Sequence, residues 1–299
     1  MPRFTDIGSY VTGLPTRDDR GVLVLSIDEL AERKVPHCVI IVWEAGKFLS
    51  TTQKGWLLAD VVPLSAQDER LLCIGTHGKY LEKNASAERD ETMVGPGISI
   101  DDRGPLRCAK NIAGHVYVVG GDRQAYRMTP ERRWQSLDQG QLSLPSDDGK
   151  IFGFEALDGF DPGEIYAVGL RGEIWLYNDR IWQNINSPTN ILLTTVCCAG
   201  DGYVYIAGMN GLLLKGRNDT WEVIDLDGFA YDFWDLCWFQ EKLYLATMHT
   251  IYRLDGDAVT AVDSGACSCA KLSCTAAVMW SIGAKDVMAF DGLVWSRID

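Results

Sequence analysis

Short apolar runs that end in a small residue recur along the chain, with polar turns between them. The copies are Leu71–Gly75, Val116–Gly120, Ile165–Gly169, Val204–Gly208, Leu243–Thr247 and Met279–Gly283. The spacing between their last residues is 45, 49, 39, 39 and 36. A repeat of this length indicates one small structural unit that is copied along the chain.

Tryptophan positions support the same repeat. Four tryptophans lie 12 to 14 residues after the small residue that ends a run: Trp134, Trp182, Trp221 and Trp295. The copy that ends at Thr247 carries Thr260 at the equivalent place. The two landmarks together define the phase of each unit.

Each unit is predicted to hold four strands. In the clearest copy these are residues 194–199, 203–208, 212–215 and 221–224, with turns between them. Asn210-Gly211, between the second and third strands, is a strong hairpin signal because both residues accept positive φ. Ile27–Lys34 is the one stretch that suggests a turn of helix.

Four-stranded units of this length are typical of β-propeller blades, so the predicted fold is all-β. We expect one β-propeller domain over residues 1–299, most simply seven-bladed, with six or eight blades as alternatives. The predicted blades are 30–64, 65–100, 105–138, 151–186, 190–225, 229–262 and 270–299. The segment 1–29 would close the ring, with Gly21–Leu25 pairing against the last blade.

Charge limits the class of partner. The formal net charge is −13, from 41 acidic and 28 basic residues. Nucleic-acid binding needs a basic surface, so no nucleic acid is expected. An acidic surface fits a basic protein partner, although it also simply keeps a protein soluble.

The apolar runs are too short for a membrane protein. The longest, Cys38–Trp43, cannot span a bilayer. The first residues, Met1–Gly13, lack the apolar core of a secretory signal. We therefore expect a cytoplasmic protein without membrane association, whose nine cysteines are reduced thiols.

The turns of two blades resemble those of the bacterial YVTN/BNR-like propellers, which are WD40-like. The matching stretches are Gly169–Trp182 and Gly208–Trp221, with a looser match at Asp291–Trp295. The serine and glycine of the sialidase-type Asp-box are missing, so the turns are only Asp-box-like. The resemblance implies architecture alone, because fold does not carry function across such a group.

No known catalytic motif is present, and we expect no catalytic residue, no cofactor and no metal. The sequence holds no Walker loop, dinucleotide fingerprint, nucleophile elbow or HExxH. Cys267-x-Cys269 suggests a metal or redox site, but no histidine follows it. Four other cysteines fall in predicted first strands, where they act as small apolar residues: Cys108, Cys197, Cys237 and Cys274.

Residues that do not repeat are the candidate partner-binding residues. Phe229, Tyr231, Asp232 and Phe233 precede a first strand, and aromatic anchors among acidic groups are typical of binding hot spots. Plain core packing is the alternative for this segment. The other candidates lie in turns or in a long insertion: Arg171, Asn210, His249, Asp147 and Asp148.

These patterns favour a non-catalytic protein-binding module. Its most specific form is a cytoplasmic immunity or inhibitor protein that is monomeric alone. It would neutralise a basic bacterial toxin or effector domain by steric and electrostatic blocking. The alternatives are a glycosidase- or lyase-like enzyme with its site at the channel mouth, and an assembly chaperone scaffold.

Overall fold

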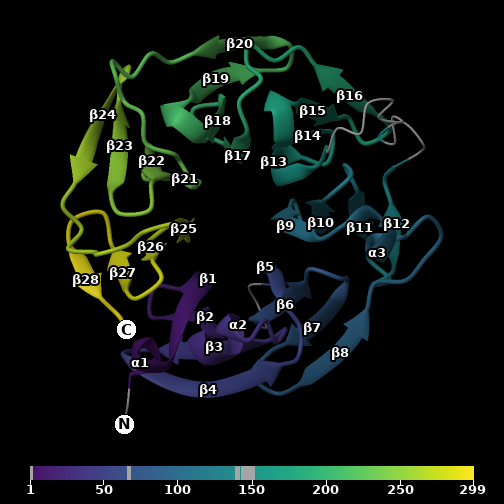
Figure 1. Ribbon diagram of the computed structural model, residues 1–299, viewed down its shortest axis with the longest axis vertical. Helices are drawn as coiled ribbons and strands as arrows, with labels where there is room; N and C mark the ends of the chain where they lie inside the picture. The colour runs from purple at the N-terminus through teal and green to yellow at the C-terminus, as the bar shows by residue number, and fades with distance from the viewer. Residues whose placement is uncertain (1–2, 66–68, 139–141, 143–151) are drawn as a thin grey trace. The chain divides into compact units, whose positions relative to one another are not determined.

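The computed structural model describes residues 3–65, 69–138, 142 and 152–299. Within these residues the strands form seven four-stranded antiparallel sheets, each from four consecutive strands (Figure 1). The fold is a seven-bladed β-propeller, so the predicted fold class and blade number are confirmed. Contacts divide the chain into two compact units: unit 1 comprises residues 1–58 and 225–299, and unit 2 comprises residues 59–224.

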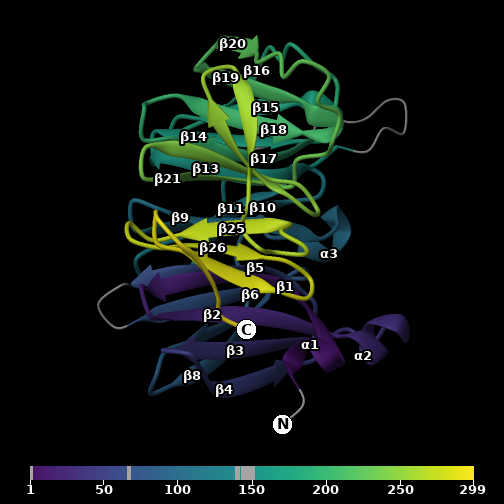
Figure 2. The same ribbon diagram turned by 90° about the vertical axis from the view of Figure 1, so that its left-hand side faces the viewer.

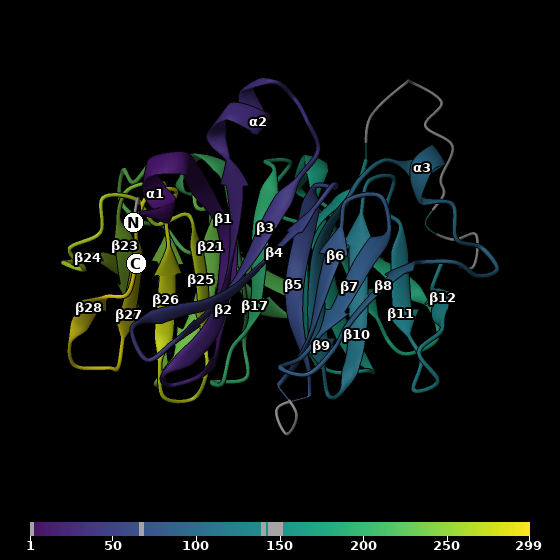
Figure 3. The ribbon, with the colours of Figure 1, turned by 90° about the horizontal axis from the view of Figure 1, so that it is seen from below.

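Unit 1 holds three sheets and two short helices. The first sheet consists of β1 (Gly8–Arg17), β2 (Arg20–Ile27), β3 (Cys38–Glu44) and β4 (Lys47–Lys54). The sixth consists of β21 (Asp235–Phe239), β22 (Lys242–Ala246), β23 (Ile251–Asp255) and β24 (Ala258–Val262). The seventh consists of β25 (Lys271–Cys274), β26 (Met279–Ile282), β27 (Val287–Phe290) and β28 (Trp295–Arg297). Figure 3 shows α1 (Phe4–Ile7) and α2 (Asp28–Glu32) at one end of the first sheet.

Unit 2 holds four sheets. The second sheet consists of β5 (Leu58–Ser65), β6 (Arg70–Gly75), β7 (Lys79–Lys83) and β8 (Glu88–Thr92), followed by α3 (Ile100–Arg103). The third consists of β9 (Leu106–Ile112), β10 (His115–Gly120), β11 (Ala125–Met128) and β12 (Trp134–Ser136). The fourth consists of β13 (Phe154–Asp161), β14 (Glu164–Gly169), β15 (Ile174–Tyr177) and β16 (Trp182–Ile185), with η1 (Leu170–Gly172) between β14 and β15. The fifth consists of β17 (Leu193–Cys198), β18 (Val204–Gly208), β19 (Leu213–Arg217) and β20 (Thr220–Val223), with η2 (Met209–Gly211) between β18 and β19.

The structure explains why the repeated run is apolar and ends in a small residue. The run forms the second strand of its sheet, and β18 is buried at every position. A strand buried on both faces appears in sequence as a continuous apolar run. At its end, a Cβ atom on Gly169 or Gly208 would collide with the carbonyl oxygen of Gly153 or Leu192, just before the first strand. Glycine lets the chain enter the sheet at this point.

The other landmarks also have their predicted places. The four repeating tryptophans lie in the fourth strands β12, β16, β20 and β28. The cysteines predicted in first strands lie in β9, β17, β21 and β25. The predicted helical turn near Ile27 is α2.

The first two blades differ from the predicted boundaries. The first sheet begins at Gly8 rather than near residue 30, and Gly21–Leu25 lies inside β2, paired with β1 and β3. The last sheet is completed by its own strand β28, so Gly21–Leu25 does not pair with it. The apolar run Cys38–Trp43 belongs to a third strand, β3, whose burial on both faces makes it look like an inner strand. The long excursion through α2 replaces the short turn that marks the other repeats.

Carboxylates join the first strands of neighbouring sheets. Asp158 in β13 accepts hydrogen bonds from the N–H of Gly159 on its own strand, at 2.9 Å, and of Cys198 on β17, also at 2.9 Å. Asp60 and Asp235 repeat this arrangement. They accept from Ala109 on β9 and Leu272 on β25, both at 3.0 Å. Bonds from N–H groups to an ionised acceptor are stronger than neutral ones, so these three residues stabilise the packing of one sheet on the next.

The first and last sheets of unit 1 pack against each other. Figures 1 and 2 show β25 and β26 beside β1, with which both are in contact. The rings of Trp43 and Trp280 meet edge to face, with centroids 5.5 Å apart. Lys285, in the turn after β26, donates to the carbonyls of Thr5 and Gly8 and to Asp28 at 2.7 Å. One ammonium group therefore ties α1, β1 and α2 to the last sheet.

We expect Lys285→Met to lower the free energy of unfolding by about 1 kcal/mol at pH 7, because the side chains of the pair are partly exposed. The hydrogen bonds from Lys285 and then Ser9 lower the pKa of Asp28. A lowered carboxylate pKa gives stability that is present above the unfolded value, about 4, and is lost as the pH falls through the folded value. Urea unfolding should therefore show a smaller difference between the variant and wild type at pH 3 than at pH 7.

The matched control is Arg33→Met, which removes an exposed pair with Glu29 within one turn of chain. Its effect should not exceed about 0.5 kcal/mol at either pH. A Lys285→Met effect that is equal at pH 3 and pH 7 would contradict a role for the Asp28 carboxylate.

Candidate functional site

The candidate residues that the structure describes lie either in the turn between the second and third strands of a sheet or in the connection before a first strand. In several sheets the turn between the second and third strands meets the connection that enters the first strand of the same sheet or of the next one. Backbone bonds mark this meeting: Leu170 N–H to Gly153 O, Met209 N–H to Leu192 O, and Cys269 N–H to Met248 O, all at 3.1 Å. We call this side of each sheet its connection end. Loops at such ends of a rigid scaffold are common binding elements.

The aromatic candidates form a stack at the connection end of the sixth sheet. Phe229 lies parallel to Phe233, with ring centroids 4.9 Å apart and 7° between the planes. It also meets Tyr231 edge to face at 5.5 Å and Tyr252 of β23 at 4.9 Å. Tyr231 is 66% exposed, whereas Phe233 is 0% exposed. We name Phe229, Tyr231, Phe233 and Tyr252 the aromatic stack.

Phe233 does not line the surface as the sequence suggested. It is fully buried and can act only by supporting Phe229 from below. Asp232 is half-buried beside it in the chain. Phe233 therefore belongs to the core, whereas Tyr231 is exposed and stays a predicted binding residue.

His249 lies in the turn between β22 and β23, in the same unit as the aromatic stack. The side chain is exposed, and Nδ1 lies 3.4 Å from the carbonyl oxygen of Cys267 in the next connection. Met248 beside it is 49% exposed. This turn therefore presents one apolar and one polar side chain to solvent.

Arg171 and Asn210 occupy equivalent turns in unit 2. Both have positive φ, 62° and 58°, and each is followed by a glycine that also has positive φ. Asparagine tolerates this conformation better than arginine does, so a cost of about 1 kcal/mol attaches to Arg171. The Arg171 guanidinium is exposed and lies 5.8 Å from the ring centre of Phe152. The candidates Asp147 and Asp148 lie outside the described residues.

A buried ion pair that the sequence did not reveal lies next to Arg171. Arg123, between β10 and β11, donates through Nε to Glu173 at 2.6 Å, and both side chains are over 90% buried. Glu173 also accepts from Trp175 Nε1 at 3.1 Å and from the N–H of Gly153 at 3.3 Å. The Arg123 guanidinium lies 4.0 Å from the ring centre of Phe152. The pair thus joins the turns of the third and fourth sheets and supports the ring beneath Arg171.

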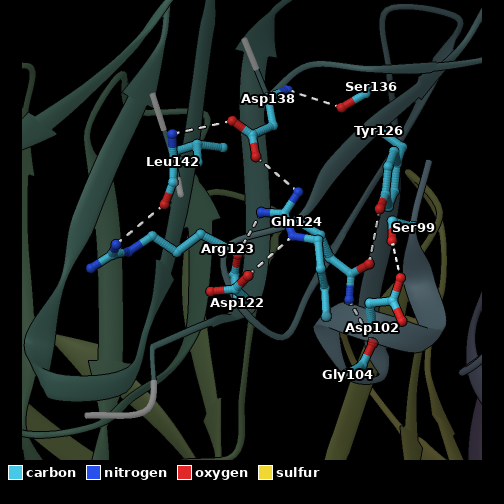
Figure 4. A network of polar contacts seen from close by, with 11 residues as sticks. Ser99, Asp102, Gly104, Asp122, Arg123, Gln124, Tyr126, Ser136, Asp138 and Leu142 are labelled. Atoms are coloured by element: carbon cyan, nitrogen blue, oxygen red, sulfur yellow. Dashed lines mark hydrogen bonds and ion pairs between the residues drawn. The ribbon is translucent and has the colours of Figure 1, made fainter. Parts of the chain in front are cut away.

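A second network adjoins this pair (Figure 4). Arg103, at the end of α3, binds the buried carboxylate of Asp138 at 2.8 Å and the carbonyl of Asp122 at 2.6 Å. Asp138 in turn accepts from the N–H of Leu142, and Arg123 donates to the Leu142 carbonyl. Charged groups therefore hold Asp138 and Leu142, two described residues of the connection between the third and fourth sheets.

Sequence carries only a faint signal for these networks. Arg123 and Glu173 stand three and four residues after the glycines that end their repeated runs, so they fall in turns of neighbouring blades. Nothing in the sequence says that these two turns touch. The signal for Asp138 and Leu142 is weaker still, because they belong to a non-repeating insertion.

The cysteines do not form a metal centre in the described part of the chain. No group of three or more His, Cys, Asp or Glu side chains there has the geometry to hold a metal ion. All nine cysteines are free thiols. Burial raises the pKa of Cys269 to about 12, so this thiol stays protonated and unreactive at neutral pH.

Comparison with known proteins adds the family. No family model matches the chain. The chain is 36% identical over 306 aligned positions to immune protein Tsi7 of Pseudomonas aeruginosa, and the alignment covers all of both proteins. The chain belongs to the Tsi7 family of immune proteins. The sequence analysis predicted an immunity protein, and the family to which the chain belongs is one of immune proteins.

Solved structures resemble the Tsi7-family fold seen here. YCF48 bound to a D1 peptide matches with a TM-score of 0.66 at 16% identity, over 95% of this chain and 91% of that one. The WD40 β-propeller domain of Doa1 matches with a TM-score of 0.62 at 12% identity, over 97% and 92%. At such identities the likeness shows the propeller fold alone; the finer YVTN/BNR-like assignment receives no support.

Among the described residues, no helix has the length and apolar character needed to cross a membrane.

Proposed function

We propose that this protein is an immunity protein that binds a toxin protein and neutralises it by covering its working surface. The observation that carries the proposal is the 36% identity to immune protein Tsi7 along the whole of both chains. The mechanism is steric and electrostatic blocking, and the protein needs no chemistry of its own. It acts in the cytoplasm, as a monomer that pairs with one toxin molecule.

The contact surface in this proposal is the connection end of the sheets. In unit 1 it presents Tyr231, Asp232 and His249, supported by Phe229 and Phe233. In unit 2, taken by itself, it presents Arg171 and Asn210. Asp147 and Asp148, outside the described residues, stay in the proposal as candidates from the sequence alone. Exposure of the Arg171 side chain in the turn between β14 and β15 supports this choice, because binding residues are common in loops on a rigid scaffold.

The net charge of −13 supports a basic partner. Charge complementarity speeds encounter and disfavours wrong partners. A toxin with a basic surface would therefore be captured quickly at low salt. Raising the salt concentration should slow association much more than it speeds dissociation.

The test is neutralisation at known stoichiometry. The partner is first identified by co-purification from native cells and then expressed with and without this protein in a host that it kills. We expect growth to be restored, and a purified complex of one copy each. The toxin should keep its intact mass, because blocking leaves no covalent change.

Two results would overturn the proposal. Growth protection by far less than one equivalent, or a changed toxin mass, would mean that the protein acts as an enzyme. Failure to protect against any co-purifying protein would mean that the family function is not retained in this chain.

A further inference from the structure

The aromatic stack presents one largely exposed ring, that of Tyr231, which contacts a partly buried base. Tyr231 is 66% exposed, yet it contacts Phe229, which is held between buried Phe233 and the strand residue Tyr252. Three ring contacts therefore hold Phe229 in place. A partner that binds here would immobilise little further, and such pre-organised aromatic side chains make efficient anchors.

The charged residues of the chain segment that carries three of the four rings have one sign. The stretch 225–234 holds Asp225, Asp227 and Asp232 and no lysine or arginine. Asp225 and Asp227 are exposed, and the Asp225 carboxylate accepts from the N–H of Asp227 at 3.1 Å. A cation that approaches Tyr231 therefore meets attractive carboxylates and no competing basic side chain from this stretch.

Elsewhere the chain covers its own aromatic faces with its own cations. Lys215 lies 4.2 Å from the ring centre of Tyr203, and Arg217 lies 4.4 Å from that of Phe160. Tyr203 is 47% exposed, much like Tyr231. Across the part of the chain that the structure describes, by contrast, no lysine or arginine lies over Phe229 or Tyr231.

We propose that the aromatic stack, with the flanking aspartates, is a binding site for a cationic side chain of the protein partner, an arginine in the first place. A guanidinium would lie against the exposed ring of Tyr231 while the exposed carboxylates of Asp225 and Asp227 balance its charge. The planar guanidinium stacks on a ring better than an ammonium does, which favours arginine over lysine. This site assignment rests on the proposed function, because it names what the immunity surface recognises.

The direct test uses a probe that needs no toxin. Acetylated, amidated hexa-arginine is titrated into the full-length protein while backbone resonances are followed by NMR, with hexa-lysine and hexa-glutamate as comparison peptides. We expect saturable shifts centred on Phe229–Phe233 with hexa-arginine, weaker ones with hexa-lysine and none with hexa-glutamate. Tyr231→Phe should bind like wild type, because the ring is kept, whereas Tyr231→Ala should bind at least about 5-fold more weakly.

The matched control is Tyr203→Ala, which removes an exposed tyrosine that already carries the chain's own lysine. Its affinity for hexa-arginine should stay within about 2-fold of wild type. The proposal would be overturned if Tyr203→Ala and Tyr231→Ala lost the same affinity for hexa-arginine, or if neither lost any. Peptide binding would then follow net charge alone. Thermal unfolding of each variant shows that the fold is intact.

The toxin assay separates the two proposals. If wild type fails to protect cells, the proposed function fails, whatever the peptides show. If wild type protects, Tyr231→Ala should bind the toxin at least about 10-fold more weakly and Tyr231→Phe within about 3-fold. Full affinity in Tyr231→Ala would overturn the cation site while leaving the immunity function standing.

Discussion

Phe233→Ala is expected to lower the free energy of unfolding by about 3–5 kcal/mol. The ring is 0% exposed and stacks on Phe229, so its removal opens a cavity beneath the aromatic stack. The loss combines the transfer free energy of the ring with the cost of that cavity. Chemical denaturation of the purified variant measures the change, and a lower midpoint with an unchanged slope identifies it as a loss of stability.

Tyr231→Ala is the control for this experiment, because it removes a ring from the same stack at the surface. Its stability should stay within about 1 kcal/mol of wild type, since the side chain is largely exposed. Phe233→Ala should therefore lower the stability of the fold, whereas Tyr231→Ala should lower partner affinity and leave stability nearly unchanged. Comparable destabilisation by both substitutions would show that Tyr231 is part of the core and would remove it from the binding surface.

Repetition explains why most of the fold was predictable. A residue such as Gly169 or Gly208 is required by a local event, the entry of a connection beside the second strand, and that event recurs in each blade. The tryptophans of the fourth strands recur for the same reason. The first sheet escaped prediction because α2 interrupts it and because β3, a third strand, is as apolar as a second strand elsewhere.

The sequence could place the candidate residues in turns and connections, but it could not tell which of their side chains are buried. Placement was possible because the strands carry the repeated pattern, so residues that do not follow the pattern fall in the turns and connections between them. Whether Phe233 or Tyr231 faces solvent depends on a stack with Tyr252, about twenty positions away in the chain. The carboxylates of Asp60, Asp158 and Asp235 were missed for a similar reason. Their partners lie on the next sheet, and a sequence pattern does not report such contacts.

Glu173→Ala is the second substitution with a large expected effect, about 3–5 kcal/mol of unfolding free energy. It leaves the buried guanidinium of Arg123 without its carboxylate. It also removes the acceptor for Trp175 Nε1 and for the N–H of Gly153. Buried donors without an acceptor add their own desolvation cost. Urea unfolding at pH 7 measures the total.

Asp179→Ala provides the matched comparison in the same unit. It also removes a carboxylate from an arginine, Arg127 at 2.9 Å, but the carboxylate is half exposed. Water can replace it, so its loss should cost no more than about 1 kcal/mol. If Glu173→Ala costs as little as Asp179→Ala, then water reaches Arg123 and the pair is not a buried one.

The double variant Arg123→Met with Glu173→Gln separates the worth of the ion pair from the penalty of an unpaired charge. Removing both charges should recover much of the loss seen in Glu173→Ala, because no buried charge is then left alone. Recovery of stability without recovery of toxin binding would show that the pair also orients the turn that carries Arg171, through the ring of Phe152. If both stability and toxin binding recover, the ion pair only stabilises the contact between the third and fourth sheets.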